Sequence, residues 1–187
     1  TGDDADFYKL IVTGDPQLWR IQVMGHELYE LGYIDASGAQ SQTYRVPKGQ
    51  QRVRLENVFL LPGIHHIRVS GRDGGDYTLL ARPLGPPDTN GEREPNDDTS
   101  HMQSLRFGQT RTGLLQDAQD RDNYRFHLAN TGRIRLTVEP PVDGGIAAYL
   151  FWDGSSFKEF NNPVTGSKVV LDGLFPPGDY RVQLTAK

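Results

Sequence analysis

Apolar and polar residues alternate with a period of two along much of the chain, a pattern typical of strands that bury one face. Two segments, 8–12 and 124–128, show it most clearly. The residues on their apolar faces are Tyr8, Leu10, Val12, Tyr124, Phe126 and Leu128. The intervening residues are polar, with Ile11 as the exception. Both segments are therefore predicted to be β-strands that lie against a core.

Shorter runs of the same kind predict further strands, separated by turn sequences rich in Gly, Pro and Asp. These strands cover Leu18 to Val23, Tyr29 to Ile34, Gln51 to Leu55, His65 to Val69, Tyr77 to Leu80, Arg133 to Val138, Ala147 to Trp152, Lys168 to Leu171 and Tyr180 to Leu184. No segment of ten or more residues carries a convincing helical period. The pattern indicates an all-β fold built from antiparallel β-sandwiches.

The pattern also repeats along the chain. Asp4-Ala5-Asp6-Phe7-Tyr8 returns as Asp120-Arg121-Asp122-Asn123-Tyr124, a shift of 116 positions (120 minus 4). Val53-Arg54-Leu55 and Pro62-Gly63 have counterparts in the same order, at Val169-Val170-Leu171 and Pro177-Gly178. Self-similarity of this kind predicts two tandem domains, residues 1–84 and 92–187, joined by a polar, proline-containing linker at 85–91.

The two copies are incomplete at opposite ends. The first has no counterpart of Glu92 to Leu115, and the second stops at Lys187 before any counterpart of Asp76 to Leu80. Either the chain is a segment of a longer array, or each sandwich closes with fewer strands. We expect an unpaired strand edge in each copy, open to the other copy or to a second chain through strand addition.

Composition narrows the classes of partner. The 187 residues include 24 acidic and 20 basic ones, a net charge of −4, which argues against a nucleic-acid partner. The longest apolar stretch, Ile146 to Trp152, is far shorter than the roughly 20 residues of a membrane helix, so no membrane insertion is predicted. The absence of cysteine removes disulfides, thiolate metal sites and thiol nucleophiles.

Oxygen-bearing side chains gather at the start of the second copy. In an extended segment Glu92 and Glu94 project to the same side, and Asn96 and Asp97 bring further oxygens within reach. Calcium takes six to eight oxygen ligands, so a second donor group is needed. The loop that carries Asp117, Asp120 and Asp122 supplies it if this loop lies beside the linker. The alternative is an Asx-type turn and two aspartates that cap the next strand.

A set of short motifs in a fixed order resembles the bacterial pre-peptidase C-terminal domain family. The motifs are Glu92-Arg93-Glu94-Pro95-Asn96-Asp97-Asp98, Leu105, Gly108, Gly113, Asp120-Arg121-Asp122-Asn123-Tyr124, Asp153-Gly154 and Pro177-Gly178-Asp179-Tyr180. The resemblance covers nearly all of residues 92–187 and, from its middle onward, residues 3–82. The first copy departs from the family in lacking the Glu-x-Glu-Pro-Asn-Asp opening, and the second in lacking the closing tyrosine strand.

The resemblance implies a jelly-roll-like β-sandwich that serves as a non-catalytic accessory module of secreted bacterial proteases and other exported proteins. In the similar collagen-binding domains of clostridial collagenases, the segments that match Glu92, Glu94, Asn96, Asp97 and the loop 117–122 bind calcium together. We therefore expect a secreted, periplasmic or cell-surface module with a calcium-stabilised domain junction. Its expected partners are a protein or polysaccharide polymer, or neighbouring domains of the parent chain.

Two other functions stay open from the residues alone. Aromatic side chains could form a platform for a carbohydrate-binding module. Alternation puts Tyr149 and Phe151 toward the core and Trp152 outward, so Trp152 is the best candidate for ligand contact. A hydrolase with paired carboxylates comes third. His65 and His66 are adjacent in a predicted strand and point to opposite faces, which favours a structural role for His65 over metal binding.

Overall fold

The computed structural model describes residues 4–38, 41–72, 75–116, 118–153, 156–161 and 165–186. The chain divides into two compact units. The first contains residues 1–89 together with 93–95, and the second contains residues 90–92 together with 96–187. The predicted linker 85–91 overlaps this division, but the chain passes from one unit to the other more than once.

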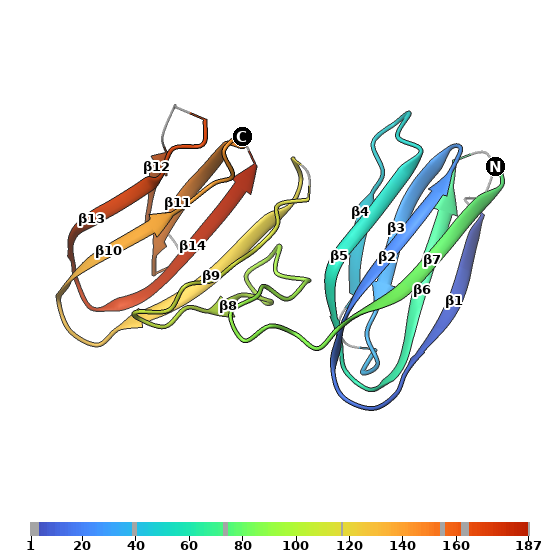
Figure 1. Cartoon of the computed structure of the whole chain (residues 1–187), viewed down its shortest axis with the longest axis horizontal. Coiled ribbons are helices and arrows are strands. Elements are labelled where there is room, and N and C mark those ends of the chain that lie inside the picture. The colour runs from blue at the N-terminus through green and yellow to red at the C-terminus, as the bar shows by residue number, and fades with distance from the viewer. Residues whose placement is uncertain are drawn as a thin grey trace. The chain divides into compact units, whose positions relative to one another are not determined.

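The first unit is a sandwich of two antiparallel sheets (Figure 1). Its strands are β1 (Ala5–Val12), β2 (Gln17–Gly25), β3 (Leu28–Ile34), β4 (Ser41–Arg45), β5 (Arg52–Leu60), β6 (Gly63–Gly71) and β7 (Tyr77–Gly85). One sheet has the order β1-β6-β3-β4 and the other has the order β5-β2-β7. All the pairings are antiparallel, as the alternation predicts.

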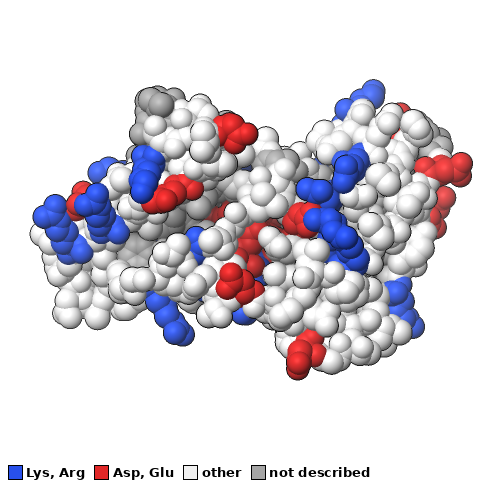
Figure 2. Space-filling model, in the orientation of Figure 1, with Lys and Arg blue, Asp and Glu red and all other residues white. Residues whose placement is uncertain are grey.

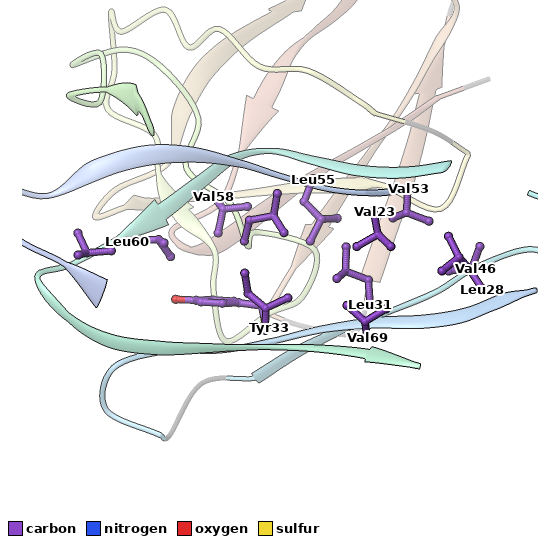
Figure 3. Packing of buried hydrophobic residues seen from close by; sticks show 13 residues of the cluster. Val23, Leu28, Leu31, Tyr33, Val46, Val53, Leu55, Val58, Leu60 and Val69 are labelled. Carbon is purple, nitrogen blue, oxygen red and sulfur yellow. The ribbon is translucent and has the colours of Figure 1, made fainter. Parts of the chain in front are cut away.

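Apolar side chains from both sheets fill the space between them (Figure 3). Val23, Val53 and Leu55 point from one sheet toward Leu31 and Val69 on the other. Because successive residues of a strand alternate between faces, every second residue of each strand points into this layer of apolar side chains.

The second unit has the same kind of architecture. Its strands are β8 (Gln103–Ser104), β9 (Arg121–Leu128), β10 (Gly132–Val138), β11 (Ile146–Trp152), β12 (Ser156–Asn161), β13 (Val169–Phe175) and β14 (Gly178–Ala186). The larger sheet has the order β12-β11-β14-β9-β8 and the smaller sheet consists of β10 and β13. The short β8 pairs with β9 in parallel, and every other pairing is antiparallel.

The fold class predicted from sequence is confirmed, whereas several boundaries were wrong. The strands β4 and β12 were not predicted, and neither was the short β8. Strand β7 runs through Pro83 to Gly85 instead of ending at Leu80. On the face shown in Figure 2, cationic and anionic side chains are interspersed over each unit. Within the described ranges, no helix has the length and apolar character of a membrane span.

Two glycines show why the Pro-Gly turns recur. Gly63 begins β6 and Gly178 begins β14, and both have a φ of 148°, a region that other residues rarely adopt. A β-carbon at Gly178 would lie 2.5 Å from Nε1 of Trp152, and one at Gly63 would lie 2.5 Å from Cβ of Ala36. Both the conformation and the close approach therefore require glycine at these two turns.

Candidate metal centre

A largely irregular segment, which includes the short β8, precedes β9 in the second unit and pairs with its edge through β8. The amide of Glu92 donates to the carbonyl of Thr112 at 2.9 Å, and the amide of Thr112 donates to the carbonyl of Asn90 at 3.0 Å. The Arg111 guanidinium donates to the carbonyl of Gly91 at 3.1 Å. These bonds hold the stretch around Glu92 against the stretch around Thr112.

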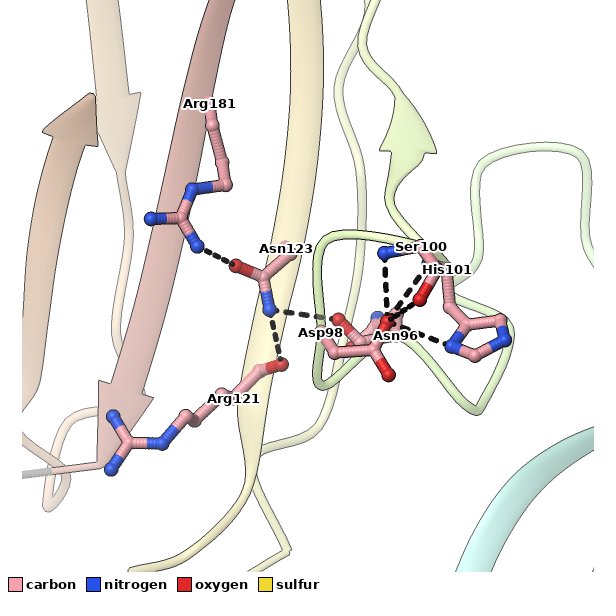
Figure 4. Close-up of polar contacts among 7 residues, drawn as sticks. All are labelled: Asn96, Asp98, Ser100, His101, Arg121, Asn123 and Arg181. Carbon is pink, nitrogen blue, oxygen red and sulfur yellow. Dashed lines mark hydrogen bonds and ion pairs between the residues drawn. The ribbon is translucent and has the colours of Figure 1, made fainter. Parts of the chain in front are cut away.

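Asn123 attaches the same segment to β9 (Figure 4). Its side-chain Nδ2 donates to the carbonyl oxygens of Asn96 and Arg121 at 2.9 and 3.1 Å, and its own amide donates to Asn96 at 3.1 Å. Its Oδ1 accepts from Gln183 at 3.2 Å and from Arg181 at 3.4 Å. Asn123 is fully buried, so it fixes Asn96 beside the strand.

Four carboxylates converge where this segment meets the start of β9. Glu92, Asp120 and Asp122 are 2%, 7% and 2% exposed, and Asp97 is half-buried. Carboxylate oxygens of Glu92 and Asp122 lie within 4.8 Å of one another, and so do those of Asp97 and Asp120. The predicted approach of the segment 92–97 to the loop before β9 is therefore correct for these four residues.

Gly113 makes room for two of these carboxylates. A β-carbon at this position would lie 2.4 Å from Oε2 of Glu92, 3.1 Å from Oδ2 of Asp122 and 3.2 Å from the hydroxyl of Tyr124. Any larger residue would have to displace at least one of these oxygen atoms. The absence of a side chain thus creates a cradle lined by oxygen.

Backbone amides stabilise three of the carboxylates. Glu92 Oε2 accepts from the amide of Leu114 at 2.8 Å, and Asp120 Oδ2 accepts from the amide of Gln116 at 2.5 Å. Asp97 Oδ1 accepts from the amide of Arg121 at 3.2 Å. These bonds orient the acids and favour their ionised forms.

This arrangement raises the pKa of Asp122. Burial, followed by the negative charges of Glu92 and Asp120, raises its pKa from 3.8 to about 8, against the opposing effect of a hydrogen bond from Asn96. A carboxyl group in this environment either takes up a proton or is compensated by a cation. The site is thus suited to a positive charge.

The side-chain amide of Asn96 lies beside Asp122. One of its terminal atoms lies 3.2 Å from both Asp122 Oδ1 and the carbonyl oxygen of Arg121. If that atom is the amide nitrogen, it donates to both oxygens. If it is the amide oxygen, it can accept from Asp122 only when that carboxyl group holds a proton.

Two other predicted ligands, Glu94 and Asp117, are not among these four residues. Glu94 is buried in the segment assigned to the first unit, where its amide donates to Asn57 and its carbonyl accepts from Phe59, at 2.9 and 2.8 Å. Asp117 lies outside the described residues. Asp98, next to the predicted ligands, forms an Asx-type turn in which Oδ1 accepts from the amide of Ser100 at 2.8 Å.

The aromatic residues near Trp152 are arranged differently from the prediction. Trp152 is 38% exposed, but it stacks on the buried Tyr180 and thus lies at the margin of the core face. Tyr149 and Phe151 are on the opposite face, where Arg181 covers the ring of Phe151. Trp152 is exposed as expected, whereas the prediction that Tyr149 and Phe151 face the core was wrong.

His65 has the structural role expected of it. It is 1% exposed, and its Nε2 donates to the carbonyl of Leu61 at 2.7 Å while Nδ1 accepts from the hydroxyl of Tyr33 at 3.2 Å. Tyr180 makes the corresponding bond in the second unit, from its hydroxyl to the carbonyl of Pro176 at 2.7 Å. Both side chains close the turn that precedes their strand.

Comparison with known proteins leaves the family open. No family model matches the chain, and no curated protein matches it. Among solved structures, the crystal structure of YhhW from Escherichia coli is 11% identical over 98% of this chain and 78% of that chain, with a TM-score of 0.22. A similarity this weak carries no argument about function.

Proposed function

We propose that the second unit binds calcium through the acidic cluster, and that the chain is a non-catalytic accessory module of an exported bacterial protein. The observation that carries the proposal is the burial of Glu92, Asp120 and Asp122, together with the approach of Glu92 and Asp122 to Gly113. Buried acids this close together repel one another, and a bound cation would relieve that repulsion.

The donor set favours calcium over other metals. The groups of potential ligands in the described part of this site contain carboxylates and no histidine, and the chain has no cysteine. Zinc and copper prefer nitrogen or sulfur ligands, whereas calcium takes six to eight oxygens in irregular geometry. Glu92, Asp97, Asp120, Asp122 and the Asn96 amide supply that number, since each carboxylate has two oxygens.

The metal would have a structural role. Glu92 and Asn96 come from the segment that precedes β9, and Asp122 comes from β9 itself. A cation bound by these residues would join the segment to the sheet. It would thereby stabilise the second unit, including the first residues of that unit after the linker. Glu94 stays a predicted ligand because it lies between Glu92 and Asn96 in the sequence.

The wider role follows from the resemblance noted in the sequence. The two units have corresponding strands in the same order, β1-β6-β3-β4 and β9-β14-β11-β12, which supports two copies of one module. Modules of this kind would attach the parent protein to a polymer or another protein, separate its domains, or support a neighbouring domain.

A hydrolase with paired carboxylates has one observation in its favour. Asp122, with its raised pKa, lies beside Glu92, as a general acid lies beside its partner in a glycosidase. Both side chains are only 2% exposed, however, so a sugar cannot reach them without opening the segment. An ion or a proton fits the buried space, and this supports metal binding over hydrolysis.

Titration calorimetry with calcium tests the proposal. The chain should bind about one calcium ion, and Asp122→Asn and Glu92→Gln should each abolish the heat of binding. Asp98→Asn is the matched control, because Asp98 is next to the site in sequence but bonds within its own turn. If Glu94→Gln leaves affinity unchanged, the second unit provides the ligands alone. If the unsubstituted chain releases no heat with calcium, the proposal is wrong.

A further inference from the structure

The outer face of the sheet β5-β2-β7 carries a group of arginines. Because Ile21 of β2 and Val53 of β5 belong to the core, the residues on either side of each point outward. Residues that pair directly across two strands lie on the same face, so the partner of Arg20 on β7 points outward as well. We call the four arginines at these positions the cationic face: Arg20, Arg52, Arg54 and Arg82.

The positive charge of the cationic face is only partly neutralised. Glu56 accepts from Nε of Arg20 at 2.6 Å and from Nε of Arg54 at 2.9 Å, so one carboxylate serves two guanidinium groups. Within the described part of the chain, neither Arg52 nor Arg82 forms an ion pair. Four arginines and one glutamate leave a local charge of about +3 in a chain whose net charge is −4.

Two contacts hold this charge in place without cancelling it. Nε and Nη2 of Arg52 donate to Oε1 of Gln22 at 3.2 and 2.8 Å, and Gln22 is buried. A neutral amide thus orients the guanidinium group and leaves its charge unchanged. Arg82 lies directly opposite Arg20, and like charges in that position destabilise a sheet. An anion bound at this face would relieve that repulsion and would meet a guanidinium group that is already oriented.

The corresponding strands of the second unit do not carry the same charge. Val170 stands on β13 where Arg54 stands on β5, and it is 43% exposed. The outward positions of β10 and β13 hold two arginines, Arg133 and Arg135, and one acid, Asp172, which accepts from Arg133 at 2.8 Å. The excess of positive charge is therefore particular to the first unit and is not a general property of this sheet.

From this charge and its arrangement we propose that the cationic face binds an acidic segment of another protein. Guanidinium groups bind carboxylates through paired hydrogen bonds, which suits Arg52 and Arg82. Met24 and Leu80 point outward on the same face and are 42% and 44% exposed, so the partner also meets apolar side chains. A protein segment with acidic and apolar residues matches both properties, whereas a sulfated polysaccharide matches only the charge. The proposal does not depend on calcium.

Fluorescence anisotropy with two labelled peptides provides the test, on the full chain with a chelator present. The first peptide alternates glutamate with leucine, and the second has serine at each leucine. The first should bind at low salt and lose affinity as the salt rises, and the second should bind more weakly. The double variant Arg52→Gln and Arg82→Gln should bind the first peptide about three- to tenfold more weakly, the size of two exposed charge pairs. Both arginines are exposed, so this variant should fold.

Arg135→Gln is the matched control, because Arg135 is an exposed arginine on the corresponding sheet of the second unit. It should leave the affinity for the first peptide unchanged. The proposal is wrong if the first peptide does not bind at low salt, or if the double variant binds it as tightly as Arg135→Gln does. Heparin serves as the polysaccharide probe. The proposal is also wrong if the two peptides bind equally, or if the double variant weakens the binding of heparin and not that of the first peptide.

Discussion

The two units carry one motif, Asp-x-Asp-x-Tyr, at the start of corresponding strands, and its residues lie in different environments. In the first unit the motif is at positions 4–8 and its three members are exposed at the edge strand β1. In the second unit it is at positions 120–124, and the same three residue types are buried. The sequence of the strand is therefore not what determines the chemistry of the motif.

The neighbouring segment determines it. In the first unit Asp6 accepts a hydrogen bond of 2.5 Å from the hydroxyl of Tyr77 on β7, and partial burial followed by this bond raises the pKa of Tyr77. In the second unit the segment before β9 places Glu92 and Asn96 beside Asp122 instead. One motif thus serves as a polar contact between strands in one unit and as part of the proposed metal site in the other.

The largest difference between the two motifs should be in how the free energy of unfolding depends on pH. Because the pKa of Asp122 is about 8 in the folded unit and 3.8 when unfolded, the calcium-free folded unit holds a proton that the unfolded chain has released between these values. Stability should therefore fall as the pH rises, by at most about 4 kcal/mol from about pH 5 to about pH 8.

Urea unfolding with a chelator, across that range of pH, measures this slope. Asp122→Asn should remove the slope, and the equivalent substitution Asp6→Asn should leave it in place. A slope that survives in Asp122→Asn would mean that another group titrates.

The next prediction compares the loss of stability when the residue after the second aspartate of each motif is replaced. Asn123 is buried and bonds two carbonyl groups, whereas its counterpart Phe7 is 62% exposed. Asn123→Ala should cost about 2–4 kcal/mol, because it removes the buried side-chain hydrogen bonds of Asn123, and Phe7→Ala should change stability by less than about 0.5 kcal/mol. Chemical denaturation measures both, and equal costs would contradict the comparison.

A smaller loss is expected from filling the cradle. Gly113→Ala places a methyl group 2.4 Å from Glu92 Oε2, which should cost about 1–3 kcal/mol and weaken calcium binding. Gly132→Ala is the control, since its nearest contact would be 3.7 Å away. Thermal melting and calcium titration of the two variants should separate them, and similar behaviour would show that the cradle does not matter.

The smallest effect concerns a feature that the units share. Tyr180 and His65 each bond to the carbonyl four residues earlier. Tyr180→Phe and His65→Phe should each cost about 1 kcal/mol by loss of this bond. Equal costs would support the equivalence of the two units, whereas a cost in one variant alone would show that the turns are held differently.

Much of the fold was predictable because local signals agreed. Alternation placed the long strands, and the Pro-Gly pairs placed the turns before β6 and β14. The strand β4 was missed because Ser41–Arg45 has a single apolar residue, Tyr44, so it carries no alternation. An edge strand of this kind forms through pairing with β3, which local sequence does not reveal.

The face of Trp152 shows another limit of the pattern. The segment 146–152 is apolar at every position, so alternation cannot decide which residues face the core. Pairing decides it: Leu150 lies opposite Val182 and Trp152 opposite Tyr180, both core residues. Register is a property of the sheet, and it is absent from the single strand.

The candidate site was predictable in part. Residue types and spacing identified Glu92, Asn96, Asp97, Asp120 and Asp122, because oxygen donors two residues apart in an extended segment share one side. The roles of Gly113 and Asn123 could not be derived in this way. Each depends on a close approach between segments distant in sequence, although both residues were part of the motifs that suggested the family.

The claim that the second unit binds calcium is tested most directly by unfolding each unit separately. The chain has two tryptophans, Trp19 in the first unit and Trp152 in the second, so Trp19→Phe and Trp152→Phe leave one reporter each. With calcium at about a hundredfold excess over Kd, the Trp152 signal should show a gain of about 2.7 kcal/mol over the chelated protein. The Trp19 signal should change less. Identical unfolding curves of the Trp152 reporter with calcium and with chelator would contradict the account.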